Sequence, residues 1–166
     1  MKVTIHQPEH LPWLGFFHKI NMADVYVALD SVQYRKNYFQ NRNKIRTKDG
    51  WRWVTVPIKK SSIDTLIKDV HISQDGFNEK KDNLQTIHQS YFRAKYFEYF
   101  WDGFKAIYEQ NFDYPVELNL KLIKYMLESM GIKKEIILSS DLNIEGKKGD
   151  LIFNICRAIG ADTYIS

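Results

Sequence analysis

Apolar residues follow two different patterns along the chain, and both ends show strand-like and helix-like patterns in alternation. Short continuous apolar runs are typical of strands buried on both faces, whereas apolar residues three and four positions apart are typical of helices. The elements predicted at the two ends are a strand at residues 3–5, a helix opened by Pro12, a strand at 25–29, a strand at 135–138, a helix at 150–159 and a strand at 163–165. This alternation predicts the α/β class, with a mostly parallel, Rossmann-like sheet flanked by helices.

The middle of the chain predicts an insertion between these two ends. Two strand-like arms, 41–47 and 51–58, flank Lys48-Asp49-Gly50, which indicates a β-hairpin because glycine readily adopts the positive φ of a tight turn. A helical block follows. Its predicted elements are a short strand at 68–72, a helix that begins at Asp75 or Asn78 and extends to Arg93, an aromatic helix at 96–110 and a helix from Pro115 to Gly131.

Positive charge is concentrated in and around the hairpin. The chain has a net charge of +4, but residues 33–60 contain nine Lys and Arg against one acid, Asp49, so this stretch carries +8 and the rest −4. Such a concentration favours an anion-binding surface. The alternative is a solvated hairpin, since lysines on edge strands discourage aggregation. Interleaved aromatic residues would also suit base stacking on nucleic acid.

Composition places the chain among globular proteins. It has 166 residues, of which 44% are hydrophobic and 27% charged, with 24 aromatic side chains. We expect residues 1–166 to form a single α/β domain. One cysteine, Cys156, excludes a disulfide within the chain. Because the start lacks a signal-peptide pattern and no apolar run is long enough to span a bilayer, we expect a cytoplasmic protein without a transmembrane segment.

Candidate catalytic residues follow the first two predicted strands. His6 and His10 lie after strand 3–5, and Asp30 directly follows strand 25–29. Ligands of open parallel sheets bind outside the carboxyl ends of the strands, so these side chains are candidates to polarise a phosphate and to act as a base, a hydroxyl acceptor or a metal ligand. A proline-bounded loop with surface histidines and a capping aspartate is the alternative interpretation.

Amide, cationic and aromatic side chains near these positions are candidates for substrate binding. The stretch 33–43 is too polar for a core, and Arg42 between two asparagines could bind a phosphate or carboxylate with two parallel hydrogen bonds. The candidate binding residues are Gln7, Trp13, Gln33, Tyr34, Lys36, Asn37, Asn41, Arg42, Asn43 and Trp53.

Common cofactor and catalytic motifs are missing from the sequence. It contains no Walker loop, no glycine-rich dinucleotide fingerprint and no Gly-x-Ser-x-Gly turn. His71 and His88 lack partners at metal-ligand spacing, so we expect no metal site, and the sequence identifies no cofactor.

The ordered motifs of the chain resemble the WbqC-like family. They are His6-Gln7-Pro8, Leu11-Pro12-Trp13-Leu14-Gly15-Phe16, Lys19-Ile20, Ala23-Asp24-Val25, Leu29-Asp30, Val32-Gln33-Tyr34, Lys36-Asn37, Gln40-Asn41-Arg42-Asn43, Trp53-Val54-Thr55-Val56-Pro57, Ala94-Lys95-Tyr96-Phe97 and Gly160-Ala161-Asp162-Thr163-Tyr164-Ile165-Ser166. The resemblance implies an association with polysaccharide and O-antigen biosynthesis. It also implies that family members continue past the final serine, so we expect this chain to lack their C-terminal portion.

Our leading hypothesis is a transferase that acts on a nucleotide-activated sugar or a similar phosphorylated metabolite in surface-polysaccharide assembly. Histidines 6 and 10 would stabilise phosphate charge, Asp30 would act as a base or hydroxyl acceptor, and Arg42 and Lys36 would hold the anion. The alternative is a non-catalytic module that binds an anionic glycan or nucleic acid through the basic hairpin. A homo-oligomeric scaffold for a glycan complex is a third hypothesis.

Overall fold

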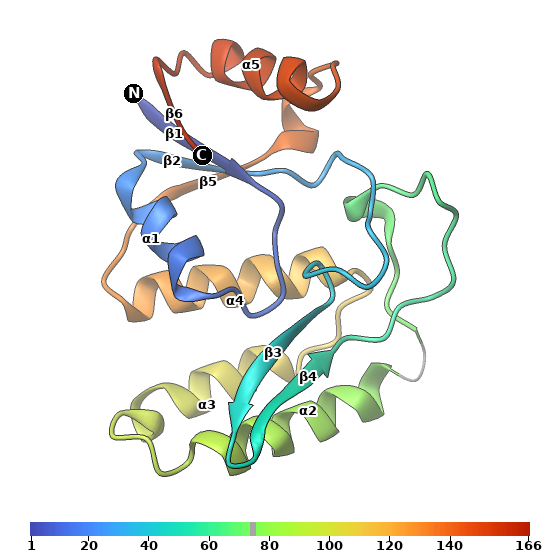
Figure 1. Cartoon of the computed structure of the whole chain (residues 1–166), viewed down its shortest axis with the longest axis vertical. Coiled ribbons are helices and arrows are strands. Elements are labelled where there is room, and N and C mark those ends of the chain that lie inside the picture. Colours follow the sequence, from blue (N-terminus) through green and yellow to red (C-terminus); the bar gives the residue numbers. More distant parts are fainter. Residues whose placement is uncertain (74–75) are drawn as a thin grey trace.

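A four-stranded parallel sheet organises one half of the protein. The computed structural model describes residues 1–73 and 76–166. The strands are β1 (Lys2–His6), β2 (Val25–Ala28), β5 (Glu135–Leu138) and β6 (Thr163–Ile165), in the spatial order β5-β2-β1-β6. All three pairings are parallel. The predicted α/β class and the parallel sheet are therefore confirmed (Figure 1).

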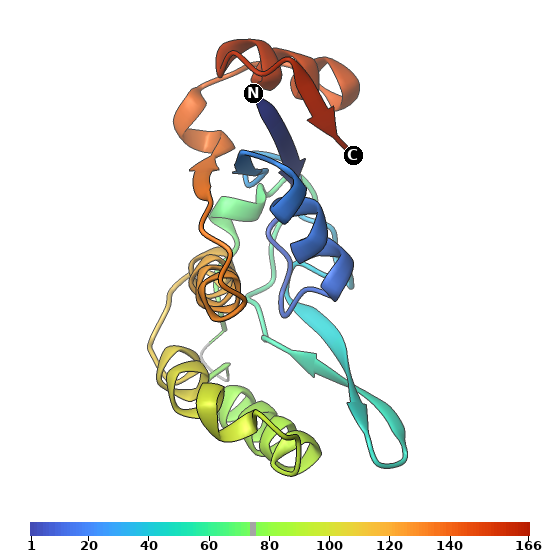
Figure 2. The ribbon, with the colours of Figure 1, turned by 90° about the vertical axis from the view of Figure 1, so that its left-hand side faces the viewer.

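Helices cover both faces of this sheet. The helices α1 (Leu14–Met22) and α4 (Pro115–Ser129) lie on one face, and α5 (Lys148–Ala158) lies on the other (Figures 1 and 2). Side chains of β2 alternate between them, because Tyr26 packs with α1 and α4 whereas Val27 packs with α5. All four residues of β2 are buried, as a strand covered on both faces requires.

The inserted segments form the other half of the protein. The hairpin consists of β3 (Arg42–Thr47) and β4 (Gly50–Thr55), paired antiparallel, and α2 (Gly76–Tyr91) and α3 (Phe97–Tyr108) pack beneath it. Ile45, Val54 and Ile87 join the hairpin to α2 in one small apolar cluster. Gly50, at the end of the hairpin turn, has a φ of +125°. This positive value agrees with the prediction that glycine allows the chain to turn here.

One predicted boundary and one predicted strand differ from the structure. The helix after β1 begins at Leu14, and Pro12 lies in the loop before it, because Trp13 is the extended residue that caps the helix. Residues 68–72 are not a strand. A 3₁₀-helix, Ile67–Asp69, occupies their start, and a single bridge joins Ile72 to Ile58.

The helix ends were predicted more closely. Pro115 opens α4 as its first residue, and Gly131, with φ of +71°, follows its end, as expected for residues that lack a free N–H or a Cβ atom. Asp75 lies outside the described residues, as does the side chain of Asn78, so the cap predicted there has no structural counterpart to compare. No helix within the described residues is long and apolar enough to cross a membrane.

The strand order creates a switch point beside β1. The chain proceeds from β1 to β2 and β5 in one direction, and β6 then pairs with the opposite side of β1. In open α/β sheets the crevice at such a reversal, outside the carboxyl ends of the strands, is where ligands bind. His6 is the last residue of β1 and therefore marks this position.

Candidate functional site

His6 presents a neutral imidazole with one free nitrogen at the end of β1. Its ring lies edge-on against Phe16, with 5.2 Å between the ring centroids, and its Nδ1 is 3.0 Å from the Gln7 carbonyl oxygen. Burial lowers the pKa of His6, the hydrogen bond to Gln7 opposes that shift, and the Lys19 charge lowers the pKa further. Because a carbonyl oxygen only accepts, Nδ1 carries the proton, and Nε2 is left without a hydrogen-bond partner among the described residues.

Glu9 and Lys19 complete a group of three titratable side chains around the end of β1. Glu9 is only 7% exposed. Burial raises its pKa, and the Lys19 charge partly reverses that shift. Burial lowers the pKa of Lys19, and the Glu9 charge opposes it. Neighbouring groups with perturbed pKa values are typical of functional sites, so Glu9 and Lys19 join His6 as candidates that the sequence pattern did not single out.

Asp30 lies at the end of β2, where its carboxylate is enclosed by serines. It is 2% exposed. Its Oδ1 accepts hydrogen bonds from the Ser139 hydroxyl at 3.0 Å and the Ser140 backbone N–H at 2.9 Å, and its Oδ2 accepts one from the Ser140 hydroxyl at 2.7 Å. Both serines begin the 3₁₀-helix Ser139–Leu142 that follows β5. Asp30 therefore ties the carboxyl ends of β2 and β5 together.

His10 lies inside the protein, at the centre of a chain of hydrogen bonds. It is fully buried. Its Nδ1 is 2.9 Å from Asn119 Oδ1, and its Nε2 is 3.1 Å from the Tyr108 hydroxyl. Because the amide oxygen only accepts, Nδ1 donates and Nε2 accepts the Tyr108 proton; the Tyr108 oxygen in turn accepts from Asn83 at 3.4 Å. Burial lowers the pKa of His10 to about 4, although the Asn119 hydrogen bond opposes the shift.

The His10 network anchors the loop between β1 and α1 to the start of the hairpin. Asn119 donates to the carbonyl oxygens of Pro8 at 3.2 Å and Gln40 at 2.7 Å. The His10 backbone N–H donates to the Phe39 carbonyl at 2.7 Å. His10 is consequently a residue that positions the loop, and both of its ring nitrogens are occupied inside the protein.

A row of amide and phenol side chains, which we call the polar seam, joins the end of β1 to the hairpin. It consists of Gln7, Tyr34, Gln40 and Asn41. Gln40 donates to Gln7 at 2.6 Å, the Tyr34 hydroxyl donates to Asn41 Oδ1 at 2.8 Å, and Asn41 Nδ2 donates to the Val56 carbonyl at 2.9 Å. Three of the predicted binding residues are thus brought together here.

Trp13 and Asn43 line a small pocket between the hairpin and the loop that joins β1 to α1. The pocket has a volume of about 290 Å³, and Leu11, Pro12 and Lys44 also line it. Asn43 Nδ2 donates to the Leu11 carbonyl at 3.0 Å, which fixes the hairpin side of the pocket. Trp13 is 70% exposed and presents its indole at the rim.

The outer face of the hairpin stacks cations on tryptophans. The Arg42 guanidinium lies 4.2 Å from the Trp53 ring centroid, and the Lys44 ammonium lies 3.7 Å from that of Trp51. Arg42 Nη2 also donates to the Asn37 carbonyl, whereas its buried Nε has no partner in the described part of the chain. We call Arg42, Lys44, Trp51 and Trp53 the cation–aromatic face. The cross-strand pairs Lys44–Trp53 and Arg46–Trp51 place cations of β3 and tryptophans of β4 on the same side of the hairpin.

The remaining predicted binding residues lie on the connection between β2 and β3. Gln33 donates to the Ile63 carbonyl, so its side chain braces two loops against each other. Lys36 is exposed, and Asn37 adopts a left-handed conformation with φ of +61°. The structure therefore places Gln33 and Asn37 in structural contacts and leaves Lys36 available to a ligand.

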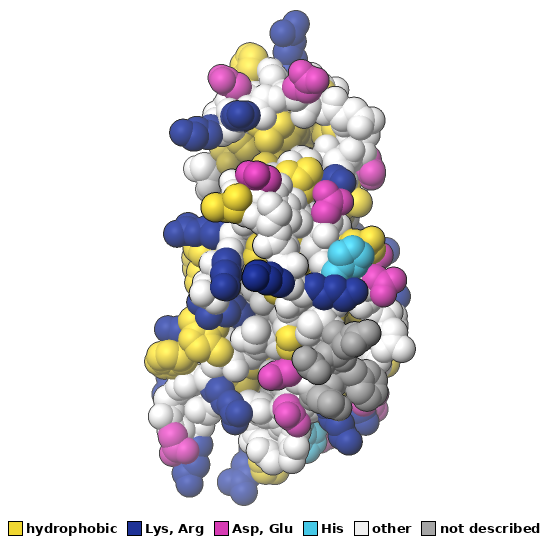
Figure 3. All heavy atoms as spheres, turned by 90° about the vertical axis from the view of Figure 1, so that its right-hand side faces the viewer, with side chains coloured by type: hydrophobic (Ala, Val, Ile, Leu, Met, Phe, Trp, Pro, Cys, Tyr) yellow, Lys and Arg dark blue, Asp and Glu magenta, His cyan; other side chains and the backbone are white. Residues whose placement is uncertain are grey.

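Positive charge gathers on the side toward which the parallel strands end. β1 points toward the right of Figure 1, and Figure 3 shows that side, with Lys and Arg side chains in a band across its middle. None of the nine cations between residues 33 and 60 forms an ion pair with an acid of the described residues within 4.0 Å. These charges are therefore free to attract an anion. The described residues contain no group of three or more His, Cys, Asp or Glu that could hold a metal ion.

Comparisons with known proteins identify relatives over nearly the whole chain. A family model described as the WbqC-like protein family matches residues 7–166. The chain is also similar to the Uncharacterized protein Rv1507c of Mycobacterium tuberculosis, with 30% identity over 168 residues, which covers 99% of this chain and 71% of that protein. No solved structure matches the chain.

Proposed function

Because the chain belongs to the WbqC-like protein family, we propose that it is a group-transferring enzyme that acts on a nucleotide-activated sugar or a similar phosphorylated metabolite in surface-polysaccharide biosynthesis. The observation that carries this proposal is the neutral His6 ring, whose Nε2 is free at the end of β1 beside the switch point of the sheet. Such crevices hold ligands in open α/β sheets. The resemblance of the motifs to the family supports the polysaccharide context.

His6 is the general base in this proposal. Its Nε2 accepts the proton of an acceptor hydroxyl while that oxygen attacks the transferred group, and the phosphate-linked leaving group departs with the electrons of the broken bond. The Nδ1–H bond to Gln7 holds the required tautomer and stabilises the imidazolium that forms. Lys19 lies close enough to affect the pKa of both His6 and Glu9, and its charge adds to the burial that keeps the His6 ring neutral before the reaction.

Two cations beside the polar seam, Lys36 and Arg42, would bind the anionic part of the substrate. Lys36 is exposed, and Arg42 is held in place by Asn37 and Trp53 before any ligand arrives. A guanidinium fixed in this way loses little conformational entropy on binding a phosphate. The diphosphate of an activated sugar carries the charge that these side chains would neutralise.

Asp30 and His10 take positioning roles in this proposal. Both carboxylate oxygens of Asp30 already accept hydrogen bonds from Ser139 and Ser140, and both nitrogens of His10 are occupied. A base needs a lone pair within reach of the substrate proton. Of the three catalytic candidates taken from the sequence, His6 alone has a ring nitrogen without a hydrogen-bond partner among the described residues.

A thermal-shift screen with nucleotide-linked sugars, followed by an assay of nucleotide release, tests this function. A ligand present at 100-fold above its Kd stabilises the folded state by about 2.7 kcal/mol, which is a measurable rise in Tm. His6→Asn keeps an N–H that can donate to Gln7 but removes Nε2, so we expect ligand binding to persist and nucleotide release to be lost. The exposed His18 of α1 supplies the matched control, since His18→Asn should leave both unchanged.

An enzyme that releases nucleotide at the same rate in the His6→Asn variant would refute the role of His6. If no activated sugar raises the Tm of the unaltered chain, the transferase proposal fails as a whole. The two results are distinguishable because the first concerns turnover and the second concerns binding.

The cation–aromatic face favours a second function, a non-catalytic module for an anionic glycan. Lys44 lies over Trp51 and within 5.2 Å of the Trp53 centroid, and Arg42 covers Trp53 as well. Ring faces already occupied by cations offer charge rather than a surface for base stacking, so acidic sugars fit better than nucleic acid. Salt-sensitive binding of an acidic polysaccharide that is lost in Lys44→Gln and kept in His6→Asn would support this module.

A further inference from the structure

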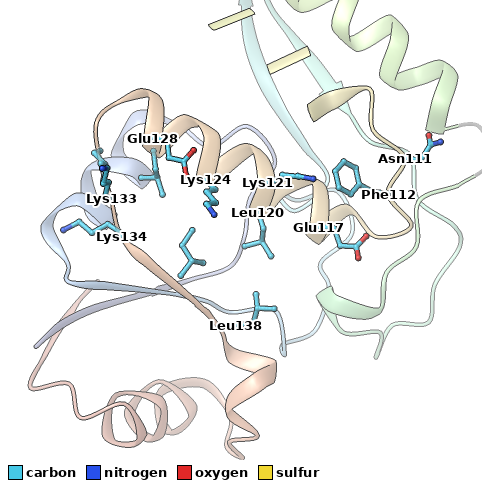
Figure 4. A pocket seen from close by; sticks show the side chains of 13 residues that line it. Asn111, Phe112, Glu117, Leu120, Lys121, Lys124, Glu128, Lys133, Lys134 and Leu138 are labelled. Atoms are coloured by element: carbon cyan, nitrogen blue, oxygen red, sulfur yellow. The ribbon is translucent and has the colours of Figure 1, made fainter. Parts of the chain in front are cut away.

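A second, separate hollow lies between α4 and the edge strand β5. It has a volume of about 850 Å³, within the range of small-molecule pockets. β5 is the last strand of the sheet, and β2 is its partner on one side only. α4 packs over α1 and β2, so the flank of α4 and the edge of β5 leave this space open to solvent (Figure 4).

The floor of the hollow is aliphatic. Leu120 and Leu138 point toward one another across it in Figure 4, and Leu127, Ile132 and Ile136 complete the lining. All except Leu127 are only partly buried. Partly exposed aliphatic side chains around one concavity are a surface that an apolar group can cover.

Four lysines surround this floor. Lys121 donates to Gln110 Oε1 at 2.7 Å, and Lys134 donates to the Ala23 carbonyl. Lys124 and Lys133 form neither a hydrogen bond nor an ion pair with any described residue. Two glutamates, at positions 117 and 128, also line the hollow, so the lining carries a net charge of +2.

We propose that this hollow binds a single-chain anionic amphiphile, a linear alkyl chain with a phosphate or carboxylate head, as a monomer. The chain would lie on the aliphatic floor between Leu120 and Leu138, and the head would meet the ammonium groups of Lys124 and Lys133. Burial of the alkyl groups against this floor would supply the apolar part of the binding free energy. The lining of this hollow does not include His6, and its ligand is independent of the transferase proposal.

Other occupants fit the hollow less well. A peptide strand that added to β5 would meet Lys133 and Lys134 directly before a four-residue edge strand, and short edges with lysines discourage such pairing. A nucleotide would lack a platform for its base, because Phe112, at one end, is the only aromatic side chain of the lining among the described residues.

Isothermal titration with decyl phosphate below its critical micelle concentration tests the proposal. Decyl maltoside, with the same chain and a neutral head, and inorganic phosphate, with no chain, are the reference ligands. We expect both to bind at least tenfold more weakly than decyl phosphate. Replacing both free lysines, Lys124→Gln with Lys133→Gln, should weaken decyl phosphate binding about tenfold, equivalent to about 1.4 kcal/mol.

Lys81→Gln combined with Lys147→Gln gives a matched control, because both residues are exposed and lie outside the hollow. This control and His6→Asn should bind decyl phosphate as the unaltered chain does. Equal affinity for decyl phosphate and decyl maltoside would overturn the proposal, as would equal losses in the two double variants. Binding to anionic vesicles without binding of the monomer would also overturn it, since that result indicates a membrane surface rather than a ligand site.

Discussion

Protonation of His10 should destabilise the folded protein between pH 6.5 and pH 4. In the unfolded chain the ring titrates with its ordinary pKa of 6.5, whereas burial lowers the pKa to about 4 in the folded protein. The unfolded state therefore binds a proton in this pH window that the folded state does not bind. Stability is full above pH 6.5 and falls as the pH decreases toward 4, where the loss levels off.

The size of this effect follows from the pKa difference. One pKa unit corresponds to about 1.36 kcal/mol, and pH 5 lies about 1.5 units below the unfolded pKa, so His10 alone should cost about 2 kcal/mol between pH 7 and pH 5. The structural cause is specific. In the neutral ring, Nδ1 donates to Asn119 and Nε2 accepts from the Tyr108 hydroxyl. A proton on Nε2 would face that hydroxyl, so the hydrogen bond from Tyr108 to His10 would be lost.

Urea denaturation at pH 7 and pH 5 measures the loss. His10→Gln removes the titration and retains an oxygen that can accept from Tyr108, so the decrease in unfolding free energy should be about 2 kcal/mol smaller than in the unaltered chain. His18→Gln, on the exposed side of α1, should behave like the unaltered chain. Equal decreases in all three proteins would refute the reasoning. If His10→Gln does not fold, NMR titration of the ring answers the same question, because a ring that titrates above pH 6 contradicts the buried neutral state.

Three further substitutions report on the site. Asp30→Asn weakens the charge-assisted bonds to Ser140 and should lower the unfolding free energy by about 2–3 kcal/mol in urea titrations, whereas an effect below about 0.5 kcal/mol would contradict the enclosed carboxylate. Gly15→Ala adds a methyl group that would overlap the exposed indole of Trp13, so the ring must move aside. Tryptophan fluorescence should therefore change while stability changes by less than about 1 kcal/mol, and an unchanged spectrum would be inconsistent with the overlap. Lys44→Gln should reduce the salt dependence of polyanion binding by one ionic contact, and an unaltered slope would exclude the cation–aromatic face from that binding.

The local elements were predictable because their signals are local. The strands at 135–138 and 163–165 agree with β5 and β6 residue for residue, since short apolar runs between polar turns identify them. The segment at 68–72 misled the prediction. Its apolar residues alternate as in a strand, but Ile67 packs into the core as part of a 3₁₀ turn and only Ile72 reaches a partner strand position.

The candidate site was predictable only in part, because its chemistry depends on contacts between distant residues. Adjacency of β1 and β2 follows from the order of elements, and it places His6 and Asp30 at one edge of the sheet. The burial of His10 depends on Asn119 and Tyr108, which lie 109 and 98 positions away in the sequence. The residues around His10 therefore do not predict these two hydrogen bonds. Glu9 was missed for the same reason, since its neighbour Lys19 approaches only after α1 folds back on β1.

The pairing of β1 with β6 has a consequence for how the chain acquires its fold. Lys2 pairs with Thr163, so β1 meets its second neighbour only after some 160 further residues have been made. Until then one edge of β1 is unsatisfied, and the apolar residues that α5 will cover stay exposed to solvent. Contacts this distant in sequence slow folding and lengthen the interval in which partly folded chains can aggregate. Protection of nascent chains during that interval would therefore benefit the yield of this protein more than it would benefit a bundle of local helices.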